Sequence, residues 1–197
     1  MAITPIILAA GASRRLGRPK QMVVYQNESL LRRTIKLCHK SGFLSPVVVV
    51  GCEGEKVAAH CAGLSCYLEQ NHKWPLGMSS SLQAGLKRAK KEGFGVLEGV
   101  IFLVCDQPFL DEKVLSKLKA KALSNLEETI FCQYGLDSET FGPPAYIPCR
   151  HFPKIERLKG DEGAKKVVGS LAFSKVLFPS GGMDIDTAAD LARLEGL

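Results

Sequence analysis

The stretch IILAAGASRRLGRPKQM, residues 6–22, places a short apolar run directly before a glycine and a cluster of basic residues. The apolar part, residues 6–10, predicts a buried β-strand. Ligands of open α/β sheets bind at the carboxyl ends of the strands. Gly11 lets the backbone approach a ligand closely, and the amides after it can donate to phosphate oxygens. The basic residues that follow are Arg14, Arg15, Arg18 and Lys20. The stretch therefore predicts an anion site at a strand end, with a solvated basic turn as the alternative.

Two well-known phosphate motifs do not account for this stretch. GASRRLG lacks the GxGxxG spacing of a dinucleotide-binding turn, and no GxxxxGK[ST] sequence follows the strand. The anion site predicted here is therefore neither of these two motifs.

The rest of the chain alternates between apolar runs and amphipathic stretches. Strands are predicted at 6–10, 46–51, 65–71, 100–108, 129–134, 144–148 and 174–179, and helices at 29–42, 55–63, 79–93, 110–123, 160–171 and 187–197. Strands that alternate with helices indicate a three-layer α/β fold with a mostly parallel sheet. We expect a single domain over residues 1–197. The segment 135–144, GLDSETFGPP, is predicted to be a loop or an inserted subdomain.

Composition narrows the classes of function. The chain has 197 residues and a net charge of +6, which favours an anionic partner; nucleic acid is disfavoured because no aromatic residues interleave with the basic ones. No apolar run approaches the ~20 residues of a membrane helix, and the N-terminus lacks the basic region of a signal peptide. The seven cysteines form no CxxC pair, so we expect reduced thiols and a cytoplasmic protein.

Two acidic motifs complement the basic stretch. VCDQP, residues 104–108, places an aspartate at the end of the most apolar run, and DID, residues 184–186, follows the last predicted strand. Carboxylates at strand ends suit Mg²⁺ that also binds phosphate oxygens, although a helix cap or a turn could explain either motif. No GxSxG elbow, histidine pair or activated cysteine motif is present. These features favour phosphoryl or nucleotidyl transfer, which needs no protein nucleophile.

Six segments, read in order, carry a resemblance to a known family. They are LAAGASRRLGRPK (8–20), NHKWPLGMSSSLQAGL (71–86), CDQP (105–108), FGPPAYIP (141–148), LKGDEGAKKVV (158–168) and DIDTAADL (184–191). Over nearly the whole chain the sequence resembles the molybdenum cofactor cytidylyltransferases, a group of MobA-like NTP transferases that act on molybdopterin. The resemblance implies a Rossmann-like nucleotidyltransferase fold that binds a nucleoside triphosphate and Mg²⁺.

The resemblance also implies a role for each matching residue. The catalytic residues would be Arg15, Lys20 and Asp106, and the metal ligands Asp106 and Asp186. The nucleotide-binding residues would be Leu8, Ala9, Ala10, Gly11, Ala12, Ser13, Gly77, Met78 and Ser81. The acceptor would face an irregular segment at about 135–165, with Gly142, Pro143, Gly160, Asp161 and Gly163 as its binding residues.

The implied reaction is transfer of CMP from CTP to the terminal phosphate of molybdopterin, with release of pyrophosphate. The preference for CTP depends on Ala10, because guanylyltransferase relatives tend to have LAGG in place of LAAG. Lys165 replaces an arginine of the family pattern, which leaves the acceptor open. The alternatives are transfer from GTP, a sugar-phosphate acceptor, or a non-catalytic molybdenum cofactor chaperone. A molybdenum hydroxylase or its chaperone is a further candidate partner.

Overall fold

The architecture is a seven-stranded sheet with helices on both faces. In a computed structural model of the protein, residues 2–92, 96–136, 139–169 and 172–196 are described. The strand order is β5-β4-β1-β6-β8-β7-β9. The strands are β1 (Ala2–Ala9), β4 (Val47–Val50), β5 (Tyr67–Gln70), β6 (Leu97–Val104), β7 (Ile130–Gln133), β8 (Phe141–Pro148) and β9 (Ser174–Leu177). β8 runs antiparallel to both of its neighbours and the other pairings are parallel. The predicted α/β fold with a mostly parallel sheet is confirmed.

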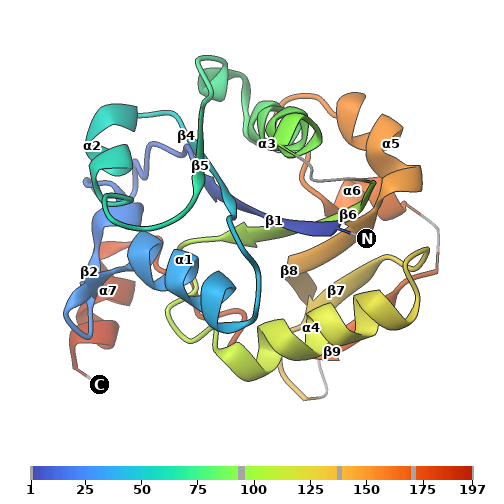
Figure 1. The fold of residues 1–197 in the computed structure, drawn as a ribbon. Coiled ribbons are helices and arrows are strands. Elements are labelled where there is room, and N and C mark those ends of the chain that lie inside the picture. The colour runs from blue at the N-terminus through green and yellow to red at the C-terminus, as the bar shows by residue number, and fades with distance from the viewer. Residues whose placement is uncertain (1, 93–95, 137–138, 170–171, 197) are drawn as a thin grey trace.

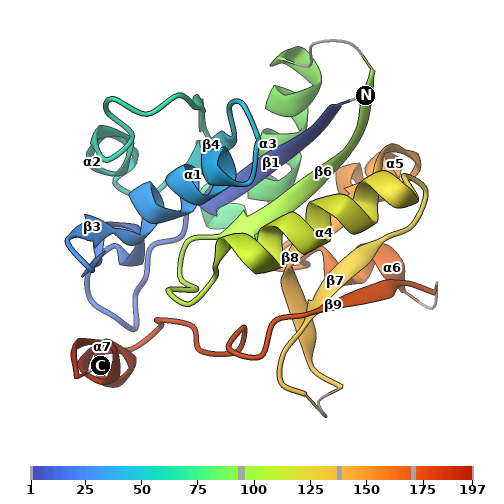
Figure 2. The same cartoon turned by 60° about the horizontal axis from the view of Figure 1, so that its bottom comes forward.

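The helices form two layers that cover the sheet (Figures 1 and 2). They are α1 (Leu30–Lys40), α2 (Gly54–Ala59), α3 (Met78–Glu92), α4 (Glu112–Ser124), α5 (Phe152–Glu156), α6 (Lys165–Val168) and α7 (Ala188–Glu195). Side chains alternate between the faces of β1: Ile7 packs in the core with α1 and α4, and Ile6 packs in the core with α3, α5 and α6. Both residues are fully buried, which explains why this strand has no polar face.

The last helix lies beside the segment that follows β1. Ile185 and Leu194 bury their side chains with Val23 and Leu30, next to the short hairpin of β2 (Val24–Tyr25) and β3 (Glu28–Ser29). Thr187 caps α7 by accepting from the Asp190 amide, and the Asp190 side chain accepts from the Thr187 amide. This docking brings the carboxyl end of the chain to the residues after β1, although the two lie far apart in sequence.

The segment 135–144 differs from its prediction. Strand β8 already begins at Phe141, and a one-turn 3-10 helix (Cys149–His151) and α5 follow it. The ladder with β7 shifts register between the pairs Phe131–Ala145 and Cys132–Gly142. Pro143 and Pro144 lie in this irregularity, where a proline that lacks an N–H group is tolerated. The segment at about 135–165 is therefore largely regular structure. Residues 137–138, part of the predicted loop, lie outside the described residues.

Smaller differences concern the ends of elements. The predicted helix 160–171 is reduced to α6, which ends before Gly169 in a left-handed conformation (φ 55°), and residues 170–171 are outside the described part. The strand predicted at 100–108 begins at Leu97 and ends at Val104. None of the described helices is long and apolar enough to cross a lipid bilayer. The single domain and the location in the cell stay predictions.

Candidate active site

A cavity of about 430 Å³ opens at the carboxyl ends of β1 and β6. Most of the predicted nucleotide-binding residues line it: Leu8, Ala10, Gly11, Ala12, Ser13, Gly77, Met78 and Ser81. Ala9 does not line the cavity, because alternation along β1 buries its side chain in the core of the opposite face. Arg14, Trp74 and Pro75 also line the cavity, although the sequence analysis gave them no specific role.

The turn after β1 is held by its own hydrogen bonds. Ser13 has a left-handed backbone (φ 50°), and its carbonyl accepts from the amides of Leu16 and Gly17 at 3.0 and 3.1 Å. The Ser13 hydroxyl oxygen accepts from the Lys20 amide at 3.0 Å. The hydroxyl proton is left for another acceptor, so Ser13 can still donate to a ligand in the cavity.

Lys20 brings together the carboxylates from both acidic motifs. Its ammonium donates to Asp106 and, at 3.1 Å, to Asp186 Oδ1. Arg15 Nη2 lies 2.8 Å from Asp186 Oδ2. Asp106 is buried, whereas the Arg15 side chain is largely exposed. The four predicted catalytic and metal-binding residues thus form one ionic cluster, next to the cavity.

The charge of Lys20 is maintained by this cluster. Burial lowers the pKa of Lys20, but the attraction and hydrogen bonds of Asp106 and Asp186 together outweigh it and raise the pKa above its ordinary value. Lys20 is therefore a cation at neutral pH.

The acidic residues suit a divalent cation that arrives with a substrate. Asp106 Oδ1 is buried and has no hydrogen-bond partner among the described residues, and the same is true of Asp184 Oδ1. The described part of the chain contains no group of three or more His, Cys, Asp or Glu side chains placed to hold a metal. Mg²⁺ commonly takes only one or two protein carboxylates and completes its shell with water and phosphate oxygens. The donor set fits such an ion.

Asp184 is a candidate residue that the sequence analysis did not place in the site. Burial raises its pKa to about 6, and the nearby carboxylates of Asp106 and Asp186 add to this effect. The loop that carries it is held against the end of β6, because the Ile185 amide donates to the Asp106 carbonyl at 2.9 Å. The DID motif contained the signal, but its spacing alone could not show which of its carboxylates turns inward.

The five residues predicted to bind the acceptor occupy two places. Gly160 and Asp161 contact the start of α3: the Ser79 amide donates to Gly160 O at 3.0 Å and the Met78 amide to Asp161 Oδ1 at 3.3 Å. Gly163 lies against the Met78 side chain. Of these three, Asp161 lines the cavity.

Gly142 and Pro143 lie on β8 and connect to the ionic cluster through Gln107. Gln107 Nε2 donates to Pro143 O at 3.2 Å, to the Tyr134 hydroxyl at 3.0 Å and to Gly181 O at 2.8 Å. Gly142 lies against the Tyr134 hydroxyl. Because Gln107 follows Asp106 directly, it links the position of that carboxylate to β8.

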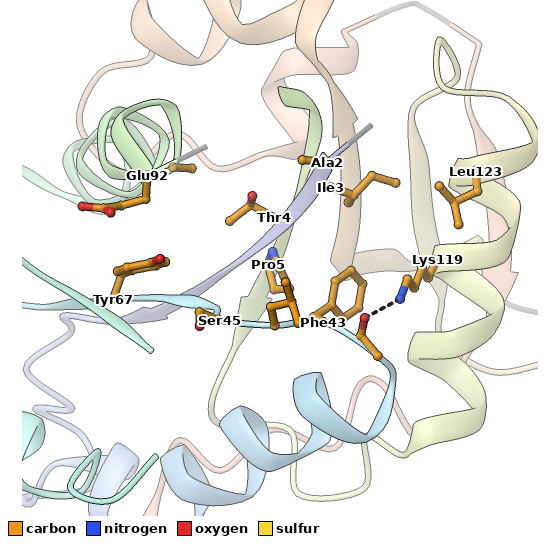
Figure 3. A pocket seen from close by; sticks show the side chains of 13 residues that line it. Ala2, Ile3, Thr4, Pro5, Phe43, Ser45, Tyr67, Glu92, Lys119 and Leu123 are labelled. Atoms are coloured by element: carbon orange, nitrogen blue, oxygen red, sulfur yellow. Dashed lines mark hydrogen bonds between the residues drawn. The ribbon is translucent and has the colours of Figure 1, made fainter. Parts of the chain in front are cut away.

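A second cavity, of about 390 Å³, lies at the opposite edge of the sheet near the start of β1 (Figure 3). The two charged side chains that line it are already paired. Lys119 donates to the carbonyls of Ser41 and Gly42 at 3.0 and 2.8 Å, and Glu92 accepts from Arg88 at 2.9 Å. None of the predicted site residues lines this second cavity, whereas most of the predicted nucleotide-binding residues line the cavity beside Lys20, which is therefore the candidate active site.

Comparison with protein families gives one match over most of the chain. The model described as "MobA-like NTP transferase domain" matches residues 5–176.

Three of the curated relatives illustrate how different their descriptions are. The purine catabolism protein PucB of Bacillus subtilis (strain 168) is 29% identical, over 92% of this chain and 88% of its own length. Nicotine blue oxidoreductase of Paenarthrobacter nicotinovorans is 28% identical, over 98% of this chain and 96% of its own length. Molybdenum cofactor guanylyltransferase of Rhodobacter capsulatus is also 28% identical, over 99% of this chain and 96% of its own length.

The fold is also shared with solved structures. Rv0371c from Mycobacterium tuberculosis H37Rv is 25% identical, with a TM-score of 0.80 over the full length of both chains. A structure of Rv0371c in complex with manganese matches with 24% identity and a TM-score of 0.77, again over both full lengths. The arrangement of the sheet and its helices is thus that of a known structural class.

Proposed function

Because this chain belongs to the MobA-like NTP transferase family and is a nucleotidyltransferase, we propose that it transfers CMP from CTP to the terminal phosphate of molybdopterin. The observation that carries the proposal is the cluster of Lys20, Arg15, Asp106 and Asp186 beside the cavity at the end of β1. A relative named molybdenum cofactor guanylyltransferase supports the choice of acceptor.

In this reaction an oxygen of the acceptor's terminal phosphate forms a bond with the α-phosphorus of CTP. The bond between the α-phosphorus and the bridging oxygen breaks, and pyrophosphate leaves with the electron pair. The attacking phosphate is already an anion, so no protein base has to remove a proton. Lys20 and Arg15 stabilise the negative charge that develops on the phosphoryl oxygens. The amides after Gly11 and the Ser13 hydroxyl orient the triphosphate.

The proposal includes Mg²⁺, bound by Asp106 and Asp186. A bound divalent cation neutralises phosphate charge and polarises phosphoryl oxygens. The unpaired Asp106 oxygen supports this assignment, as does the manganese complex of Rv0371c. Gly160, Asp161 and Gly163 on one side, and Gly142 and Pro143 on the other, would border the acceptor.

CTP is proposed over GTP because Ala10 lines the cavity with a methyl group, which narrows the space for a purine. The named guanylyltransferase relative favours the alternative, guanylyl transfer by the same residues. In a further alternative, the same reaction uses a sugar phosphate as the acceptor. In the last alternative, the protein carries the molybdenum cofactor and catalyses no transfer.

The test is the thermal unfolding midpoint with magnesium and CTP, GTP, UTP or ATP, each at about 100 times its dissociation constant. Binding at that excess adds about 2.7 kcal/mol, which raises the Tm of a chain of this size by roughly 5–11 °C. A shift with CTP that disappears on chelation of magnesium supports the proposal, and pyrophosphate release with molybdopterin completes it. A shift with GTP alone would reassign the nucleotide.

Two further measurements distinguish the proposed nucleotidyl transfer from a carrier and from an oxidoreductase. No shift with any nucleotide, with or without molybdopterin, would favour a carrier. Since one relative is named an oxidoreductase, NADH and NADPH are included, and a shift with these alone would contradict nucleotidyl transfer.

A further inference from the structure

Gln21 is a buried amide directly behind the wall of the nucleotide cavity. It follows Lys20 in a one-turn 3-10 helix (Lys20–Met22), and only 1% of its surface is exposed. A buried polar side chain is destabilising unless its hydrogen-bonding groups find partners. The hydrogen bonds of the Gln21 side chain therefore indicate which part of the structure it stabilises.

Both N–H groups of the Gln21 amide are used on the backbone at the end of β1. Nε2 donates to Ala9 O at 2.7 Å and to Gly11 O at 3.0 Å. Carbonyl oxygens only accept hydrogen bonds, so the orientation of the amide is set by its partners. Gln21 Oε1 is buried and lacks a partner among the described residues. The fold thus leaves an acceptor unpaired in order to place both donors on these carbonyls.

The two carbonyls flank Ala10, which lines the cavity. The Ala10 carbonyl itself accepts from the Cys52 amide at 3.1 Å. Three successive carbonyls at the end of β1 are therefore fixed, and Gln21 holds two of them. The backbone amide of Lys20, the residue before Gln21, also fixes this turn, because it donates to the Ser13 hydroxyl.

We propose that Gln21 is a positioning residue that sets the depth of the nucleotide cavity at Ala10 and so contributes to discrimination between a pyrimidine and a purine nucleotide. Gln21 does not line the cavity itself, so it acts through Ala9, Ala10 and Gly11. Lys20 and Gln21 are neighbours in the sequence. Lys20 contacts Asp106, and Gln21 fixes the end of β1, against which the base rests. The proposal rests on the proposed function, because it assumes that this cavity takes the nucleotide.

The test uses Gln21→Glu and Gln21→Met in the full chain, with the exposed Gln26→Met as the control. Glutamate keeps the shape of glutamine, but a carboxylate has no donor and a protonated carboxyl has one, so at least one of the two hydrogen bonds is lost. Methionine keeps the length and removes both polar atoms. We expect KM for CTP to rise about tenfold in both variants, the change that a net loss of one to two hydrogen bonds corresponds to. We expect kcat to change little, because Lys20 still reaches the carboxylates, and the preference for CTP over GTP to decrease.

Amide hydrogen exchange of residues 10–15 is measured on the same variants without ligand. Faster exchange in this turn, with unchanged exchange in β6, is the expected sign of a lost clamp. A role only in stability would lower the Tm yet leave KM and the CTP-to-GTP ratio of the folded protein as in the wild type, and that result would overturn the proposal. Unchanged exchange in the turn would also overturn it. A wild-type protein that binds no nucleotide would overturn the proposed function, and the nucleotide role of Gln21 with it.

Discussion

Lys20 shares its charge between two carboxylates that come from distant parts of the sequence. Asp106 ends the central part of the sequence and Asp186 lies near the carboxyl terminus, yet both accept from the same ammonium. Without Lys20, the buried Asp106 would face Asp184 and Asp186 with no internal cation beside it. The residue is therefore expected to serve the site in two ways, as a donor to phosphate and as the group that keeps the carboxylates together.

Replacement of Lys20 by alanine tests the first of these roles. We expect kcat to fall by roughly 10²–10³-fold, the usual loss when one preorganised donor to a developing charge is removed. The measurement is pyrophosphate release at saturating nucleotide and acceptor. Lys113→Ala is the matched control because it removes an exposed lysine of α4 that does not line the cavity. A kcat equal to that of the control would remove Lys20 from the mechanism.

Cys66 is a second residue whose chemistry depends on one neighbour. A hydrogen bond from Cys61 lowers the pKa of the Cys66 thiol, and burial opposes this shift only in part. Cys61 is buried and stays protonated, because its hydrogen bond with Cys66 and its burial both raise its pKa. The half-buried Cys66 is therefore the member of the pair that ionises.

The expected consequence is an alkylation rate for Cys66 that rises with pH and reaches half of its maximum at a lower pH than that of an ordinary thiol. A lowered thiol pKa means more thiolate, the reactive form, at neutral pH. Iodoacetamide labelling at a series of pH values, located by fragment-ion mass spectrometry, measures this. Cys61→Ala removes the donor and should shift the midpoint upward. A midpoint that does not respond to that substitution would contradict the hydrogen bond.

At the scale of elements, the start of α3 is locked against the segment before α6. Gly77 has φ +102°, a conformation that side-chain-bearing residues rarely adopt, and a Cβ atom there would lie 2.4 Å from the carbonyl of Gly160. Two hydrogen bonds, from Ser79 and Met78, complete the contact. One wall of the cavity is thus built from two elements that need a glycine where they meet.

Gly77→Ala should disturb both elements at once. Backbone strain of this kind costs about 1–3 kcal/mol, which corresponds to a decrease in Tm of roughly 2–12 °C for a chain of this length. The KM for nucleotide should rise because Met78 and Asp161 both line the cavity. Calorimetry and steady-state kinetics provide the two measurements. Gly196→Ala, where a Cβ meets nothing closer than 3.5 Å, is the control, and equal behaviour of the two variants would refute the packing argument.

The elements differ in how far the sequence could predict them. The buried strands were found because apolar runs such as Val47–Val50 have few alternatives, and α7 because its capping box has a recognisable spacing. The hairpin of β2 and β3 was missed, since two-residue strands carry no periodicity. Its turn residues, Gln26 and Asn27, both have positive φ, but QN is a weaker signal than Asn-Gly. For β8 the sequence predicts a strand only over 144–148, because the adjacent Pro143 and Pro144 are typical of a loop and the bulge that accommodates them is a tertiary feature.

The site shows the same division at the scale of the whole molecule. The close approach of Lys20, Asp106 and Asp186 could be predicted, because their motifs follow strands that end at the same edge of the sheet. Their catalytic and metal-binding roles stay predictions. The places of Asp184 and Gln21 in the site could not be predicted, because they depend on the direction in which each side chain points in the folded protein. A buried amide that binds two backbone carbonyls leaves no mark in the sequence beyond a glutamine.

The topology also predicts how a nucleotide should change the dynamics of the molecule. β1, β4 and β6 are adjacent in the sheet and covered on both faces, so their amides should exchange slowly and report global unfolding. With CTP and magnesium, protection should increase together in residues 10–22, 77–81, 160–161 and 184–186, which surround the candidate site from four distant parts of the sequence. Hydrogen-exchange mass spectrometry with and without ligand measures this. Protection that increases instead at residues 43–45, which line the cavity of Figure 3, would place the nucleotide at the opposite edge of the sheet from the ionic cluster and would refute the assignment of the site.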